Sequence, residues 1–134
     1  MPPALGVAAW AGIALWTIGF LFEAIGDWQL ARFRADPANQ GKVMDRGLWR
    51  YTRHPNYFGD ACVWWGLFLI ACDNVWGLVT IVSPVAITWL LINRTGKALL
   101  ERRLKRSKPD YEAYIRRTSG FVPWPPKRHP VSSD

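Results

Sequence analysis

The most informative stretch is residues 47–66, which read Gly-Leu-Trp-Arg-Tyr-Thr-Arg-His-Pro-Asn-Tyr-Phe-Gly-Asp-Ala-Cys-Val-Trp-Trp-Gly. Its first half is a cluster of hydrogen-bonding side chains, and its second half is apolar and rich in tryptophan. Pro55 marks the start of a helix, because proline at the first helical position loses no hydrogen bond. A membrane helix rarely begins with so many polar groups. The stretch therefore predicts that a polar, anionic molecule is held at the bilayer surface.

Long apolar runs lie on both sides of this polar cluster. Residues 1–22 contain no charge, and residues 61–93 contain only Asp73. The first run can cross a hydrocarbon core of about 30 Å once, and the second can cross it twice. A soluble all-α protein is disfavoured, because 134 residues cannot cover helices that are apolar all round. The sequence predicts an all-α, multi-pass transmembrane helical bundle, formed as a single membrane domain over 1–134. Its three crossings are expected at about 4–33, 55–72 and 75–95.

The basic residues predict the orientation of this bundle. All seventeen Lys and Arg residues fall within 32–53 or 94–128, and the net charge is +7. The positive-inside rule places both segments in the cytoplasm, with the Asp73-Asn74 turn on the other side. We therefore expect an integral membrane protein with its basic loop and carboxy terminus cytoplasmic. Membrane topology explains this charge pattern, so we expect no nucleic-acid partner.

The second basic segment predicts a surface helix. Residues 97–117 read as an amphipathic helix broken at Pro109, whose basic face would bind anionic membrane lipid. The side chains expected to lie against the bilayer are Leu100, Leu104, Tyr111, Tyr114 and Ile115.

Charged residues on the first helix point to a cavity or a partner. Glu23, Asp27 and Arg34 are spaced by four and seven, which places them on one helical face. Carboxylates at membrane depth are costly and by default face a polar cavity or a partner. The alternative is that Asp27, which is close to the helix end, pairs with an arginine at the water interface.

Cations and polar side chains converge on the start of the second helix. Positive-inside charge explains the number of cations but does not require the neighbouring Tyr51, His54, Asn56 and Tyr57. A helix start offers free backbone N–H groups and the positive end of the dipole, and guanidinium groups bind phosphate in bidentate fashion. These features predict a ligand with several phosphates. The cations concerned are Arg34, Lys42, Arg46, Arg50 and Arg53.

The second helix would supply the polar wall of a pocket. Asn56 and Asp60 lie one turn apart, and Tyr57 occupies an adjoining part of the surface. His54 taken alone is more often a capping or packing residue. The chain contains no glycine-rich Rossmann or Walker loop. We expect no metal site, because the spacing of Cys62 and Cys72 matches neither a metal motif nor a disulfide framework.

These motifs resemble the carboxy-terminal half of the steroid 5-alpha-reductase-like membrane family, in the branch known as DUF1295. The similarity runs from about Gly19 to Pro125 and includes Leu-Leu-Glu at 99–101, Tyr-Glu-Ala-Tyr at 111–114 and Phe-Val-Pro-Trp at 121–124. The resemblance implies NADPH as cofactor and a lipid-like substrate, steroid or isoprenoid. It also implies hydride transfer to an electron-poor C=C bond, with protonation of the neighbouring carbon.

The resemblance further implies roles for individual residues. Asp27 and Glu23 would meet the adenosine or ribose, while Arg34 and Lys42 would contact phosphates. Lys42 stands where the steroid reductases have arginine, so its grip would be weaker. Tyr57 and Asp60 are the catalytic candidates. The full set expected to bind the cofactor is Glu23, Asp27, Arg34, Lys42, Arg50, Tyr51, Arg53, His54, Asn56, Tyr57, Asp60 and Glu101.

Two alternatives stay open. The isoprenylcysteine methyltransferase family has a related fold and an Arg-His-Pro-x-Tyr segment, and uses S-adenosylmethionine. Its exit helix usually carries paired glutamates, where this chain has Leu100-Glu101. The other alternative is a non-catalytic truncated membrane module, because the full family has roughly twice as many membrane helices. The missing partner would then be an amino-terminal half or a second subunit.

Overall fold

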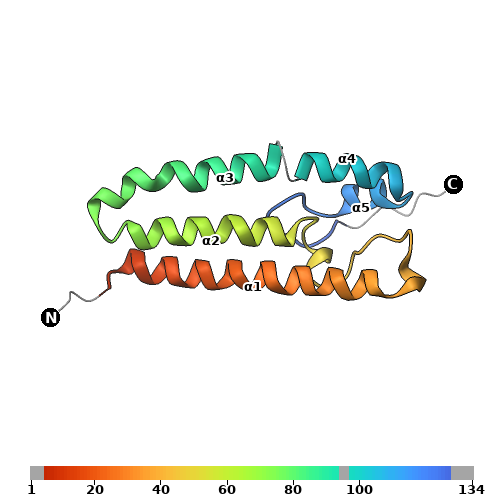
Figure 1. The fold of residues 1–134 in the computed structure, drawn as a ribbon, viewed down its shortest axis with the longest axis horizontal. Coiled ribbons are helices and arrows are strands. Elements are labelled where there is room, and N and C mark those ends of the chain that lie inside the picture. The colour runs from red at the N-terminus through yellow and green to blue at the C-terminus, as the bar shows by residue number, and fades with distance from the viewer. Residues whose placement is uncertain (1–4, 94–96, 128–134) are drawn as a thin grey trace.

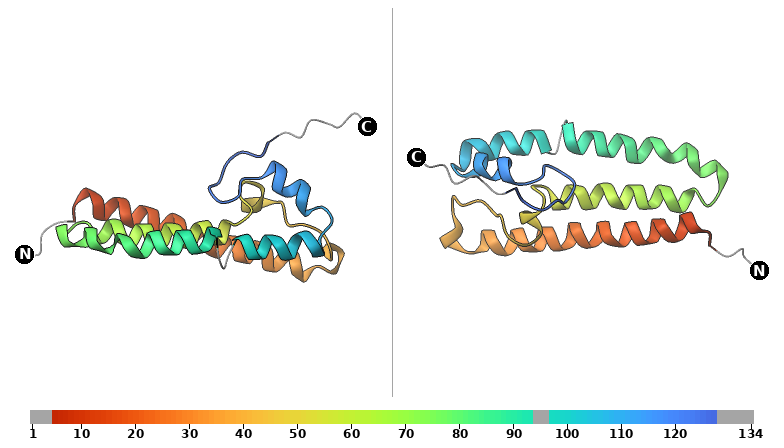
Figure 2. Two further views of the ribbon diagram at one scale, coloured as in Figure 1. Left: turned by 90° about the horizontal axis from the view of Figure 1, so that it is seen from above. Right: turned by 180° about the vertical axis from the view of Figure 1, so that it is seen from behind.

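The computed structural model describes residues 5–93 and 97–127, which form helices and connecting segments without a strand (Figure 1). Three rows of helix lie side by side in one layer: α1, α2, and α3 continued by α4. The helix α5 and the carboxy-terminal segment stand off one face of this layer (Figure 2). The α-helices are α1 (Val7–Ala35), α2 (Pro55–Ala71), α3 (Val82–Asn93), α4 (Lys97–Ser107) and α5 (Tyr111–Arg117). The short 3₁₀ helices are η1 (Pro37–Asn39), η2 (Gly47–Arg50) and η3 (Val75–Ile81).

The long helices have the length and surface of membrane segments. Two of them, Val7–Ala35 and Val75–Asn93, are long and apolar enough to cross a bilayer. Their large apolar side chains face outward: Trp10 is 60% exposed, Trp76 78% and Trp89 51%. Such exposure suits contact with lipid chains. The expected all-α membrane bundle is confirmed.

Glycines bring α1 and α2 into backbone contact. A Cβ atom at Gly19 would lie 2.5 Å from the carbonyl oxygen of Gly59, and one at Gly12 would lie 2.5 Å from that of Gly66. These neighbours are backbone atoms, which cannot rotate away. Small residues at helix interfaces allow such close approach inside membranes, where no hydrophobic force draws helices together. The contact therefore fixes the register of the two antiparallel helices.

A capping interaction joins the start of α1 to the turn that follows α2. The backbone N–H of Gly6, which precedes α1, donates to both carboxylate oxygens of Asp73 at 3.0 and 3.2 Å. Asp73 lies in the turn after α2. Its negative charge satisfies a free donor at the helix start and complements the helix dipole. This turn is therefore fastened to the beginning of α1.

The third expected helix differs from the prediction in its first half. Residues 75–81 form the 3₁₀ helix η3, and the α-helix begins at Val82. Pro84 consequently lies in the first turn of α3, where its missing N–H has no helical partner to lose. Residues 94 and 95, and residue 4 of the first expected helix, lie outside the described residues.

The prediction for residues 97–117 is right about the break at Pro109 and wrong about the surroundings of two tyrosines. The segment forms two helices, α4 and α5, with Pro109 between them. Tyr111 and Tyr114 do not lie against the bilayer, because they are only 2% and 1% exposed. The Tyr114 hydroxyl donates to the carbonyl of Trp49. An apolar stripe requires cover, and here the loop before α2 provides it in place of lipid.

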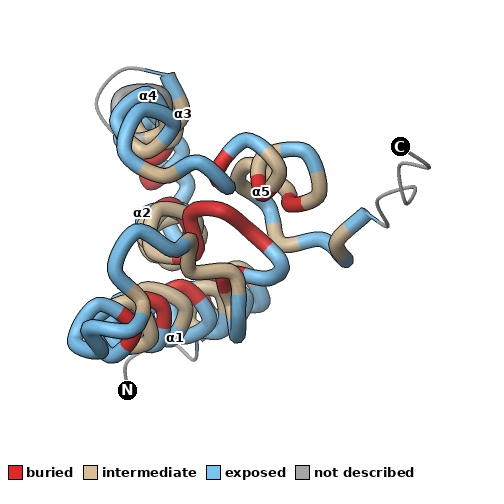
Figure 3. The backbone as a smooth tube through the Cα atoms, turned by 90° about the vertical axis from the view of Figure 1, so that its right-hand side faces the viewer, coloured by how far each residue is buried: buried red, intermediate tan, exposed pale blue. Residues whose placement is uncertain are grey.

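The segment after α5 is tied along that loop. Backbone N–H groups of Arg53 and Trp124 donate to the carbonyls of Ser119 (2.9 Å) and Tyr51 (3.0 Å). The Thr52 hydroxyl donates to the carbonyl of Phe121 at 2.7 Å. Figure 3 shows that the buried backbone concentrates between the helical layer and α5. We call residues 118–127 the strap.

The glycine contact predicts a strong effect of side-chain volume on one face of α1 alone. Gly19→Leu would force α1 and α2 apart and should cost about 3 kcal/mol of folding free energy, at the upper end for overpacking. Ala14→Leu adds bulk on the exposed face of α1 and serves as control. Thermal unfolding of the purified protein in detergent compares the two. Equal unfolding temperatures would contradict the backbone contact.

Candidate functional site

The loop between α1 and α2 is anchored where α1 leaves its apolar run. The indole N–H of Trp49 donates to the carbonyl of Gly26 at 3.0 Å, and the N–H of Leu48 donates to Gln29 Oε1 at 3.1 Å. Gly47 has a φ of 62°, a conformation that favours glycine. The 3₁₀ helix η2 is thereby held against the side of α1.

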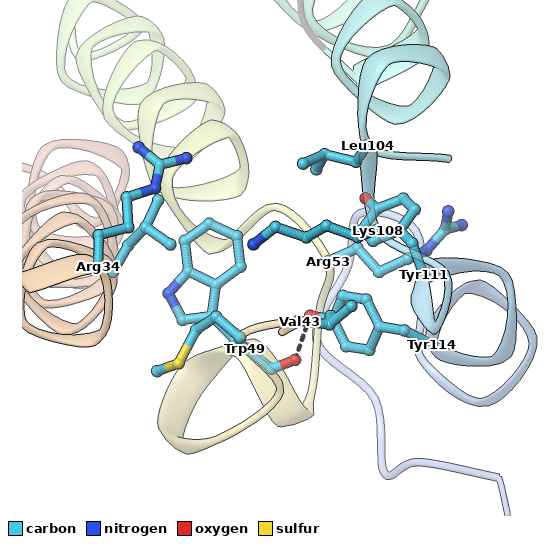
Figure 4. Close-up of a pocket in the computed structure, with 10 residues that line it drawn as sticks. Arg34, Val43, Trp49, Arg53, Leu104, Lys108, Tyr111 and Tyr114 are labelled. Carbon is cyan, nitrogen blue, oxygen red and sulfur yellow. Dashed lines mark hydrogen bonds between the residues drawn. The ribbon is translucent and has the colours of Figure 1, made fainter. Parts of the chain in front are cut away.

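A small cavity lies between α1, this loop, α4 and α5 (Figure 4). Its volume is about 40 Å³, enough for roughly three water-sized groups. Three cationic side chains line it: Arg34, Arg53 and Lys108. The rest of the wall is apolar or aromatic and comprises Leu30, Val43, Met44, Trp49, Leu104, Tyr111 and Tyr114. We call it the basic cavity.

Positive charge in the basic cavity is only partly neutralised. Arg53 forms an ion pair with Glu101. Within the described part of the chain, neither Arg34 nor Lys108 has a carboxylate partner. Burial, together with the nearby charge of Arg34, lowers the pKa of Lys108 below its ordinary value. A bound anion would neutralise the unpaired cations and would favour the charged form of Lys108. The cavity is therefore suited to phosphate or carboxylate.

Two buried polar groups beside this cavity lack a partner. In the described residues, neither Arg53 Nε nor the Tyr111 hydroxyl makes a hydrogen bond. A buried polar group left unpaired costs about 1–3 kcal/mol, so a ligand that pairs with it binds more tightly. Burial, and then the charge of Glu101, raises the pKa of Tyr111 above its ordinary value. Its hydroxyl therefore keeps its proton and can donate to an anion.

Glu101 holds the polar residues at the start of α2. Its Oε1 atom contacts Arg53 Nη1 and lies 3.0 Å from His54 Nε2. His54 is completely buried, and its ring stacks on Tyr57 with centroids 5.2 Å apart and planes 7° apart. One carboxylate from α4 therefore orients a guanidinium and an imidazole together. Because the His54 ring stacks on Tyr57, Glu101 also helps to position Tyr57.

A second polar group lies between α1 and α2. The side-chain amide of Asn56 donates to Asp27 Oδ1 at 3.2 Å. Asp27 thus finds an amide partner, where the alternative interpretation expected an arginine. Glu23 lies within electrostatic range of Asp60 and of Asp27. The acidic side chains of α1 therefore face the polar side of α2.

The expected cofactor residues consequently divide by position. Arg34, Arg53, His54, Tyr57 and Glu101 line or adjoin the basic cavity, and Glu23, Asp27, Asn56 and Asp60 follow the α1–α2 interface. The remaining three lie elsewhere. The side chain of Lys42 is exposed and its carbonyl accepts from Lys108 Nζ at 2.6 Å. Arg50 lines a separate hollow, and Tyr51 is 43% exposed.

Several cavity residues were not identified from the sequence, among them Trp49, Lys108 and Tyr111. Lys108 looked like one of many basic residues on a surface helix, and Tyr111 looked like a lipid-facing one. The Tyr-Glu-Ala-Tyr motif at 111–114 was the available signal. It served only to support the family resemblance.

Comparison with known proteins gives a family match and a distant relative. The family model described as "Protein of unknown function (DUF1295)" matches residues 1–118. A protein named "Probable O-methyltransferase ustE", from Ustilaginoidea virens, is 28% identical over 95 residues. That alignment covers 71% of this chain but only 32% of the relative. No solved structure matches the chain.

The position of Glu101 predicts that its removal destabilises the protein. Glu101→Ala would leave the buried Arg53 charge without its partner and should cost about 3 kcal/mol. Glu112→Ala, on the exposed side of α5, should change stability by no more than about 0.5 kcal/mol. Thermal unfolding in detergent measures the change in the free energy of unfolding for both variants. A Glu101→Ala protein as stable as the control would show that this ion pair does not hold the site.

Proposed function

Because the chain belongs to the DUF1295 family, as its matching residues 1–118 show, we propose that it is a membrane oxidoreductase domain that binds NADPH. The reaction would reduce a C=C bond in a lipid-like substrate, steroid or isoprenoid. The proposed topology has three crossings, in which α2 joins the two longer segments, with the basic loop and carboxy terminus in the cytoplasm.

The observation that carries the proposal is the charge of the basic cavity. Arg34 and Lys108 both line the cavity and have no carboxylate partner among the described residues, where Lys108 Nζ donates to the Lys42 carbonyl. Arg53 and Tyr111 each offer an unused donor. A dinucleotide carries several phosphate charges, which would satisfy these groups. S-adenosylmethionine carries no phosphate, and its single carboxylate is accompanied by two positive groups, an ammonium and a sulfonium. The cavity therefore favours the dinucleotide on electrostatic grounds.

Each part of the site would have a separate task. The basic cavity has the size of one phosphate group, so the remainder of the cofactor would follow the polar side of α2. Asp27, held by Asn56, would accept hydrogen bonds from a ribose. NADPH, when bound, supplies a hydride to the electron-poor carbon of the double bond. Tyr57 or Asp60 would then give a proton to the neighbouring carbon.

A second candidate function is methyl transfer from S-adenosylmethionine. It is favoured by the similarity to a protein named as a probable O-methyltransferase. The buried pair of His54 and Glu101 could hold a methyl donor as well as a dinucleotide. The cation excess of the basic cavity weighs against it.

The chain would act together with further membrane helices. It spans 32% of the length of the relative, and its helices form a layer only one helix thick (Figures 1 and 2). Glu23 and Asp60 lie within the bilayer-spanning part and would require a polar partner or substrate beside them. An amino-terminal half or a second subunit would provide that cover. Without it, the domain would be a non-catalytic membrane module.

The proposed function predicts selective binding of NADPH. Arg34→Gln should weaken NADPH binding about tenfold or more, because a charge-assisted hydrogen bond to phosphate is lost. Asn56→Ala should also weaken it. Arg32→Gln removes an exposed cation of the same helix outside the basic cavity and is the matched control. Titration of the purified protein, followed by tryptophan fluorescence, measures each affinity.

The same titration with S-adenosylmethionine separates the two candidates. Binding of the methyl donor in the absence of NADPH binding would favour methyl transfer. Binding of neither ligand would favour the non-catalytic membrane module. An equal loss of NADPH affinity in Arg32→Gln and Arg34→Gln would also contradict the proposed site, because general surface charge would then explain the binding.

A further inference from the structure

A second hollow lies between the loop before α2 and the strap. It is open to the outside, with a volume of about 710 Å³, and shares no lining residue with the basic cavity. Its walls come from two parts of the chain that are far apart in the sequence: the loop before α2, and the end of α5 with the strap. The lining residues are Asp45, Arg46, Gly47, Arg50, Arg117, Thr118, Pro125, Pro126 and Lys127.

The hollow has an excess of positive charge. Four of its lining residues are cationic and one is acidic. The acidic residue, Asp45, is already paired with Arg117 at 2.7 Å. Arg46, Arg50 and Lys127 are exposed and have no carboxylate partner in the described residues. Among the described residues these three cations line one space without an unpaired carboxylate, and the guanidinium of Arg46 also lies 6.0 Å from the centre of the Phe33 ring.

The walls are held in place by specific bonds. The N–H of Lys127 donates to the carbonyl of Arg117 at 2.8 Å, and the N–H of Trp124 donates to that of Tyr51 at 3.0 Å. Pro125 and Pro126 stiffen the intervening backbone. The Asp45–Arg117 pair joins the loop to the end of α5. The hollow is thus a built feature rather than a group of independent surface charges.

Its position corresponds to the bilayer surface. The adjoining 3₁₀ helix η2 is fastened to α1 at Gly26 and Gln29, where the apolar run of α1 gives way to charged residues. Two aromatic residues that adjoin its lining residues in the chain are exposed: Trp124, before Pro125, is 69% exposed and Tyr51, after Arg50, is 43% exposed. Exposed Trp and Tyr beside basic residues are typical of the headgroup region.

We propose that this hollow binds the headgroup of an anionic phospholipid from the surrounding bilayer. Arg46, Arg50 and Lys127 would contact its phosphate oxygens, while its acyl chains pass into the bilayer beside Trp124. Basic residues near a membrane surface attract anionic lipids electrostatically. The inference does not depend on NADPH or on any catalytic activity. It also accounts for Arg50, which lies apart from the basic cavity.

Lipid titration of the full chain tests this proposal. The purified protein in detergent is titrated with short-chain phosphatidylglycerol and with phosphatidylcholine, and bound lipid is counted by native mass spectrometry. Arg50→Gln combined with Lys127→Gln should weaken phosphatidylglycerol binding about thirtyfold and leave phosphatidylcholine unchanged. The matched control combines Arg102→Gln with Arg103→Gln, two exposed positions of α4 outside the hollow. The control should keep the phosphatidylglycerol affinity of the original chain.

Three results would overturn the proposal. Equal losses in the two double variants would mean that general surface charge attracts the lipid. Displacement of phosphatidylglycerol by an equal concentration of inorganic phosphate would mean that the hollow is an ion site only. A loss of NADPH affinity with phosphatidylglycerol binding intact would assign the hollow to the cofactor. The exposed positions chosen leave the fold unchanged, and each single variant, expected to weaken binding about fivefold, repeats the test.

Discussion

Backbone contact between α1 and α2 is the constraint on which the other features of this protein depend. Gly19 against Gly59, and Gly12 against Gly66, allow the two helices to approach until main-chain atoms touch. That approach fixes how far α2 is shifted along α1, and so places Pro55 beside Gly26. The polar start of α2 therefore lies next to the charged end of α1. Bulkier residues would separate the helices and move Asn56 away from Asp27. The polar site thus depends on residues that carry no functional group.

The rest of the site is assembled by segments that come later in the chain. Glu101 on α4 orients Arg53 and His54, while Tyr111 and Tyr114 on α5 cover the loop from the other side. Charge and burial then act together in the basic cavity. Arg34 and Lys108 lie near each other without a neutralising carboxylate in the described residues, which is unfavourable unless an anion joins them.

Sequence patterns predicted the fold well where they depended on hydrophobicity. The apolar runs, the helix start at Pro55 and the membrane character all followed from composition and spacing. The 3₁₀ form of residues 75–81 did not, because it depends on where Pro84 can be accommodated in α3. For Tyr111 and Tyr114, an apolar stripe required cover, and the sequence could not distinguish lipid from the loop carrying Trp49. Similarly, Arg50 and Arg53 are three residues apart but line different hollows, since the 3₁₀ helix η2 ends at Arg50 and the chain then pairs with the strap at Thr52.

The strap has a consequence for how the limits of this domain are defined. The family match ends at residue 118, yet Ser119, Phe121 and Trp124 supply backbone partners to the loop that carries Arg53. The segment that identifies the family is therefore shorter than the segment that completes the fold. Residues 119–124 contribute main-chain atoms, which residues of many types can provide, and the Phe121 ring also packs edge-on against Phe58 of α2. A boundary drawn from the matched residues 1–118 alone would omit a structural part of the site.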